Sequence, residues 1–189
     1  MTPPPRSRAP RVPPTAVTPD GLRGGDPLVL ATLVERRGAD VLAYATAVSP
    51  PGAGLRTAAA ALVEFRLAVP AATDPGFDPA VELLAATRRV AAVRAENPFR
   101  PGDHPRPRER TPVCEDAPRL LVAWAAGRLP DADADRLREH VAGCPDCDAL
   151  HDAFDRAEAA FAGGASPAPA PAEAGALIAA MALATPGDG

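Results

Sequence analysis

Apolar side chains recur every three or four residues along most of the chain, which is the spacing of one face of an α-helix. Three helices are predicted between residues 26 and 96. The first opens with Asp26-Pro27, an N-cap followed by a first-turn proline, and passes Gly38, where it can bend or break. The second covers about 55–67 and the third about 81–93. No segment alternates apolar and polar residues as a strand does, so the pattern predicts an all-α fold.

A second helical region follows residue 112. Its first helix is expected at about 116–127, and its second over the amphipathic DADADRLREH segment. A third carries an apolar stripe formed by Leu150, Phe154, Ala157 and Phe161. We favour packing of this stripe inside the same module, on Leu121, Trp124, Leu137 and Val141. The alternative is that the stripe binds a partner helix, together with a last apolar segment that contains Leu177, Ile178, Met181 and Leu183.

Proline, glycine and arginine divide the chain into modules. Residues 1–25 hold seven prolines and four arginines, and we predict a disordered basic arm there. Residues 97–112 hold five prolines and four arginines, which is typical of an extended linker. The sequence therefore predicts helical domains at 26–96 and 113–163, an Ala/Pro linker at 164–172 and a short C-terminal helix at 173–185. Alanine supplies 44 of the 189 residues, so each folded module must have a small core.

Charge follows the same division. Residues 1–110 contain 15 arginines and 11 acidic residues, whereas 111–189 contain 5 arginines and 13 acidic residues. The acidic second part is suited to covering a basic protein surface, whereas the basic first part keeps contact with nucleic acid open. That possibility rests on Arg88, Arg89, Arg94, Arg100, Arg106, Arg108 and Arg110. An equal alternative is that these arginines only solubilise the third helix and the linker.

The sequence contains no targeting signal that we can identify. No run of about 18 apolar residues exists, and residues 1–25 lack the apolar stretch of a secretory signal. We therefore expect a soluble cytoplasmic protein with no membrane contact. All basic residues are arginine, with no lysine, which is typical of GC-rich, bacterial coding. In a reducing compartment, three clustered cysteines more often hold a metal than form disulfides.

The strongest chemical signal is a group of four metal-binding side chains within 34 residues: Cys114, His140, Cys144 and Cys147. The CxxC pair of Cys144 and Cys147 lets two thiolates converge on one ion, and His140 precedes it by four residues. A helical hairpin would return His140 to the level of Cys114. A closed Cys₃His set favours Zn²⁺ in a structural role.

Two other interpretations of the cysteines stay open. The CxxC pair also suits a redox dithiol, although no βαβ pattern surrounds it. The cysteines could also be one buried thiol and two surface thiols without a metal. The remaining histidines, His104 in the linker and His151 on the third helix of this region, are expected to be ordinary solvated side chains.

The arrangement of Cys114, a helix ending in WAAGRLP, and then DRLREHVAGCPDC resembles the zinc-binding anti-sigma family. The hallmark of that family is His-x₃-Cys-x₂-Cys with an upstream Cys or His. Over 113–162 the resemblance implies a three-helix zinc bundle that binds a sigma factor. It often implies a fourth helix after a linker, which helps to clasp the partner and would here be residues 173–184.

Residues 26–96 resemble a degenerate copy of sigma-factor region 2, through LVLATLVERRGADVLAYATAVSPPGAG, LRTAAAALVEFRLAV and VELLAATRRVAAVRAE. The resemblance implies a helical domain that contacts RNA polymerase. The chain departs from that family because alanines replace the acidic cluster of the second helix, leaving Glu64, and because the aromatics that capture unpaired bases are missing. No promoter-reading helix-turn-helix follows.

Two functions are consistent with these patterns, and neither is enzymatic. No Ser-His-Asp order, phosphate loop or pair of catalytic carboxylates is found, and a zinc held by four protein ligands has no position for an activated water. The first function is an anti-sigma-type regulator that binds a sigma factor or polymerase subunit through its zinc module. The second is a divergent sigma-like transcription factor whose basic N-terminal half contacts DNA or RNA polymerase and is restrained by the zinc module.

Overall fold

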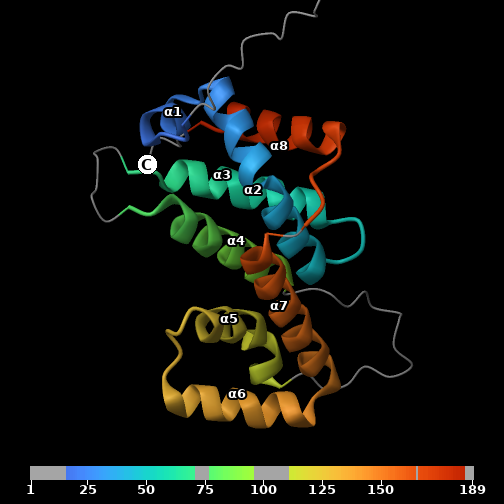
Figure 1. Ribbon diagram of the computed structural model, residues 1–189. Helices are drawn as coiled ribbons and strands as arrows, with labels where there is room; N and C mark the ends of the chain where they lie inside the picture. Colours follow the sequence, from blue (N-terminus) through green and yellow to red (C-terminus); the bar gives the residue numbers. More distant parts are fainter. Residues whose placement is uncertain (1–15, 71–76, 96–110, 165, 186–189) are drawn as a thin grey trace, which may run out of the picture.

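The computed structural model describes residues 16–70, 77–95, 111–164 and 166–185, and all regular structure in these ranges is helical. The predicted all-α class is confirmed. Figure 1 shows α5, α6 and the start of α7 at one end, and α1, α2, α3 and α8 at the other. The helices are α1 (Pro19–Gly24), α2 (Pro27–Val48), α3 (Gly54–Ala68), α4 (Pro79–Ala95), α5 (Pro112–Ala125), α6 (Asp131–Gly143), α7 (Pro145–Gly163) and α8 (Pro171–Leu183).

The long first helix begins where the sequence predicts. The Asp26 carboxylate accepts hydrogen bonds from the amides of Leu28, at 2.8 Å, and Val29, at 3.4 Å, and Pro27 occupies the first turn. α2 continues through Gly38, which is buried, so the predicted break does not occur. A β-carbon at Gly38 would lie 3.0 Å from the Cγ1 of Val34 and 3.4 Å from Pro169 in the segment before α8, so a larger residue would require Val34 to shift.

The predicted disordered arm is too long by about ten residues. Residues 1–15 lie outside the described residues, but α1 follows them, with Thr18 as its N-cap and Leu22 fully buried. The proline-rich segment therefore contains a short helix whose buried apolar residue is Leu22. The contact of Leu22 with the core stabilises this turn, and composition does not report such a contact.

The second helical region starts earlier than predicted. Thr111 caps α5 and Pro112 is its first residue, so Cys114 lies inside the first turn and not before the helix. The expected start near residue 116 was wrong because Thr111 and Pro112 already supply the N-cap and the first-turn proline, and Pro118 lies inside the helix. The predicted 97–112 linker falls outside the described residues up to 110, and its last two residues belong to the start of α5.

The apolar stripe of α7 has a further neighbour, α2, besides the hairpin helices that we favoured. Phe154 and Phe161 meet Tyr44 of α2 edge to face, with ring centroids 6.4 and 6.3 Å apart. α7 has 19 residues, against 14 in α5 and 13 in α6, so it is about 8 Å longer than either. Its last turns extend beyond the hairpin and pack on α2, so the partner helix of the alternative interpretation belongs to this same chain.

The helices of both predicted domains share one apolar core. Leu30, Val41 and Phe65 of the first region are joined to Phe154, Phe161 and Leu177 in a single cluster of buried side chains. The domain boundaries predicted from composition remain predictions. What the described residues add is that the two regions pack on each other, chiefly through α2 against α7 and α8.

Removing the α2 cap is expected to cause a small, local loss. Asp26→Ala leaves the amides of Leu28 and Val29 without their acceptor and should lower the free energy of unfolding by about 1 kcal/mol. Urea unfolding followed by circular dichroism measures the change. Asp26→Asn is the matched control, because asparagine caps about as well; a variant as unstable as Asp26→Ala would contradict the capping role.

Candidate metal centre

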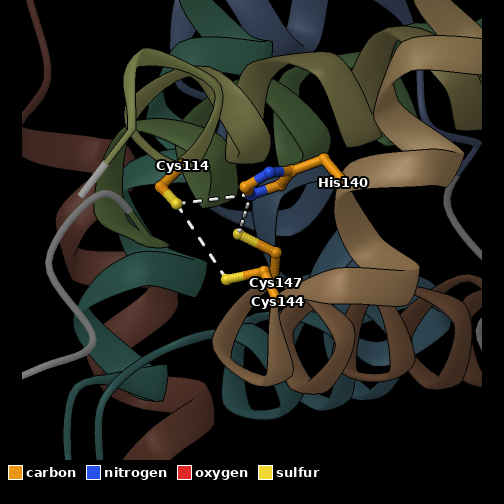
Figure 2. A group of neighbouring side chains, drawn as sticks. All are labelled: Cys114, His140, Cys144 and Cys147. Carbon is orange, nitrogen blue, oxygen red and sulfur yellow. Dashed lines mark hydrogen bonds between the residues drawn. The ribbon is translucent and has the colours of Figure 1, made fainter. Parts of the chain in front are cut away.

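Each of the four predicted ligands stands at a helix end. Cys114 is in the first turn of α5 and His140 in the last turn of α6. Cys144 is the N-cap residue of α7, and Cys147 lies one turn further on. Because the α5–α6 hairpin reverses the chain and α7 starts directly after α6, these ends meet at one corner (Figure 2).

The donor atoms converge. The Sγ of Cys114 and the Nε2 of His140 are 3.3 Å apart, and the same Nε2 lies 3.3 Å from the Sγ of Cys147. The Cys114 and Cys144 sulfurs are 4.0 Å apart, and all four donor atoms lie within 4.8 Å of one another. Cys147 is buried, whereas the other three residues are half-buried, so the group lies just beneath the surface.

These separations fit a tetrahedral metal site. Sulfur and nitrogen ligands at about 2.3 and 2.0 Å from one Zn²⁺ lie about 3.5–3.8 Å from each other. The observed distances bracket that range, so small side-chain movements would bring four donors onto one ion. Three sulfurs and one imidazole are the donors of closed structural sites, in which every coordination position belongs to the protein.

The electrostatics of the thiols also suit a cation. Burial, and then the neighbouring Cys144 and Cys114, raise the pKa of the Cys147 thiol. For Cys114, burial opposes ionisation, but hydrogen bonds from the side chain and backbone of Thr111 leave its pKa lowered overall. The Cys147 thiol therefore resists ionisation while no positive charge is near it, and a divalent ion would supply that charge.

Of the two other histidines, the structure describes His151, which takes no part in this group. His104 lies outside the described residues. His151 stacks on Trp124, with ring centroids 5.3 Å apart, and its Nε2 lies 3.8 Å from the Asp155 carboxylate. It is therefore a half-buried packing residue of α7, and the expectation that it is simply solvated was wrong.

A polar junction that the sequence did not reveal connects the centre to the N-terminal helices. Glu158 of α7 accepts hydrogen bonds from the Tyr44 hydroxyl, at 3.0 Å, and from two nitrogens of Arg88, at 2.7 and 2.6 Å. Arg88 also donates to the Ala125 carbonyl at the end of α5, at 3.2 Å. Burial and then the Glu158 charge raise the pKa of Tyr44, so its hydroxyl stays a donor. No spacing rule links residues 70 positions apart.

The arginines predicted as a basic surface are partly engaged. Arg88 pairs with Glu158, and Arg89 pairs with Glu64 at 2.5 Å. Arg94 is exposed, while Arg100, Arg106, Arg108 and Arg110 lie outside the described residues. Within the part of the chain that the structure describes, no helix combines the length and apolarity needed to cross a membrane.

A match to a known protein family covers the candidate metal centre. Residues 114–147, which begin and end at the outermost ligands, match the family model described as "Putative zinc-finger". This match accords with the resemblance of the segment to the zinc-binding anti-sigma family. No curated protein and no solved structure shows a significant match to the chain.

Proposed function

We propose that this protein is a zinc-binding, non-enzymatic transcription regulator of the anti-sigma type, acting in the cytoplasm on a sigma factor or related polymerase partner. The observation that carries the proposal is the convergence of Cys114, His140, Cys144 and Cys147 in a segment that matches a zinc-finger family. Zinc held by all four would fix the ends of α5, α6 and α7 relative to one another. It would stabilise a contact surface and activate no water.

The charge of the zinc module supports a basic protein surface as its target. Residues 111–189 carry 13 acidic residues against 5 arginines. Many of these acids lie on the exposed faces of α6 and α7, among them Asp131, Asp135, Glu139, Asp148, Asp152 and Asp155. A surface with one sign of charge attracts and orients a partner of the opposite sign. This electrostatic attraction weakens as the salt concentration is raised.

Copurification from the native host tests this function. We expect the tagged full-length chain to recover a sigma factor or an RNA polymerase subunit, and His140→Ala to recover much less because the module loses its metal. His151→Ala is the matched control and should recover the partner as the wild type does. Recovery of neither class of protein by the zinc-loaded chain would contradict the proposal.

A second candidate function is favoured by one observation. The C-terminal half of α7 and all of α8 pack on α2 and α3, which belong to the segment that resembles sigma-factor region 2. In this version the chain is a divergent sigma-like factor, and the zinc module restrains its own N-terminal half. Contact with nucleic acid is the less favoured part, since Arg88 and Arg89 are already paired.

Salt-dependent DNA binding separates the two candidates. A sigma-like factor should bind promoter DNA more tightly in 50 mM than in 200 mM salt, because phosphate contacts release counterions. A Glu158→Gln variant, which weakens the restraint at Arg88, should strengthen that binding. Equal, weak binding of both chains at both salt concentrations would dismiss the second candidate and leave the first.

A further inference from the structure

A buried arginine joins the two ends of the chain. Arg66, in the last turn of α3, is 7% exposed. Its Nε donates to the Leu22 carbonyl at 2.8 Å, and its Nη2 donates to the Arg23 carbonyl at 3.1 Å. Its Nη1 donates to the Ala184 carbonyl at 2.7 Å and also to the Met181 carbonyl.

The four acceptors have a common chemical character. Each is a backbone carbonyl in or next to the last turn of α1 or α8, where a helix leaves carbonyls without their usual i+4 amide donors. The Leu22 and Met181 carbonyls also accept from the capping amides of Gly25 and Ala184. These helix ends carry partial negative charge, so they suit a buried guanidinium. Arg66 therefore recognises the C-terminal ends of two helices through main-chain atoms, whatever their side chains are.

The backbone beside Arg66 leaves space for this arrangement. Gly25 ends α1 in the left-handed conformation, with φ at 68°. A β-carbon at Gly25 would lie 2.9 Å from the Nη2 of Arg66. The guanidinium thus occupies a position that any larger residue would obstruct, and the surface formed by α1, α2 and α3 around it is shaped to hold the group.

α8 packs on both α2 and α3, but it buries few of its own side chains. Leu177 and Met181, one turn apart, are fully buried, whereas Leu183 is 82% exposed. Its one acidic side chain, Glu173, accepts a hydrogen bond from the Ala170 amide and so caps its own helix. Within the described ranges, no side-chain hydrogen bond or ion pair of α8 reaches another helix. Its docking therefore depends on two fully buried anchors, on the partly buried Ala174 and Ile178, and on the Arg66 contacts.

We infer that the surface of α1–α3 around Arg66 is a receptor for a short apolar helix, and that α8 occupies it as a detachable plug. The recognised pattern is two apolar anchors four residues apart, followed by a helix C-terminus whose carbonyls face Arg66. Segments with few buried side chains open at lower free energy than the core. α8 therefore leaves as a unit while α2 to α7 stay folded. The inference holds whichever partner the zinc module has.

Hydrogen exchange on the full-length, zinc-loaded chain tests the detachment. We expect amides in α8 to exchange at least tenfold faster than those in the middle of α2. Arg66→Gln should increase the exchange rate of the α8 amides at least tenfold further, because glutamine cannot reach four carbonyls. The exchange rates of the α7 amides should stay unchanged. The matched control Arg89→Gln removes only an exposed ion pair and should leave α8 as it was. Equal exchange in α8 and α2, or acceleration in α7 by Arg66→Gln, would overturn the plug.

Binding of the helix in trans tests the receptor. The probe is a fluorescent synthetic peptide of residues 166–185. We expect it to bind the full-length Leu177→Ala/Met181→Ala variant at least tenfold more tightly than the wild type, whose own α8 blocks the surface. Adding Arg66→Gln to that variant should remove the gain. If the peptide does not bind the double variant, or binds equally well after Arg66→Gln is added, the receptor assignment is wrong.

Discussion

Replacing His140 with alanine is expected to abolish stoichiometric zinc binding and to unfold the α5–α7 corner. The four donor atoms come from three helix ends, and α5 and α6 together bury only seven side chains, none of them aromatic. Structural zinc contributes about 10–16 kcal/mol of apparent binding free energy, so loss of one ligand should cost at least about 5 kcal/mol. For a chain of this length, that lowers the unfolding midpoint by more than about 10 °C.

Elemental analysis and thermal unfolding by circular dichroism measure this effect. The matched control is His151→Ala, which removes a ring stacked on Trp124 but no metal donor, and should keep one zinc per chain. Removing zinc from the wild type with a chelator should cause the same loss of helical signal that is expected for His140→Ala. The metal centre would be refuted if His140→Ala kept its full zinc content, or if chelators left the circular dichroism spectrum of the wild type unchanged.

Replacing Glu158 with alanine is expected to loosen the zinc module from the N-terminal helices without removing the metal. Arg88 and Tyr44 would lose their acceptor in a largely buried junction, in which the side chains of Arg88 and Glu158 are 16% and 23% exposed. Stranding a mostly buried charge and a hydroxyl should cost about 2–4 kcal/mol. Chemical denaturation, together with a zinc assay on the same sample, measures both parts.

The control for this junction is the exposed pair of Arg89 and Glu64. Its side chains are 44% and 38% exposed, so Glu64→Ala should cost less than about 1 kcal/mol. A double variant, Arg88→Met with Glu158→Leu, should recover part of the stability lost in Glu158→Ala, because no charge is left unpaired. If Glu64→Ala and Glu158→Ala lowered the free energy of unfolding equally, the junction would stabilise the protein no more than an exposed ion pair does.

Local patterns were sufficient for most of the helices and for the grouping of the four predicted ligands. Asp26-Pro27 marks the start of α2 because a cap and a fixed proline φ act within one turn. Cys144 and Cys147 are one turn apart and His140 precedes them by four residues, so their grouping depends on short-range geometry. Cys114 needed only one helical hairpin to join them.

Pairings between distant segments were decided by the tertiary structure. The stripe with Phe154 and Phe161 is equally apolar whichever helix covers it, and only the packing of α7 along α2 brings both rings to Tyr44. Arg88 meets Glu158, and Arg66 meets the end of α8 more than 100 residues away. Helical periodicity indicates which face of a helix is buried, but it does not indicate which other helix covers that face. The choice of neighbour depends on helix length, on shape and on the partners that buried polar groups require.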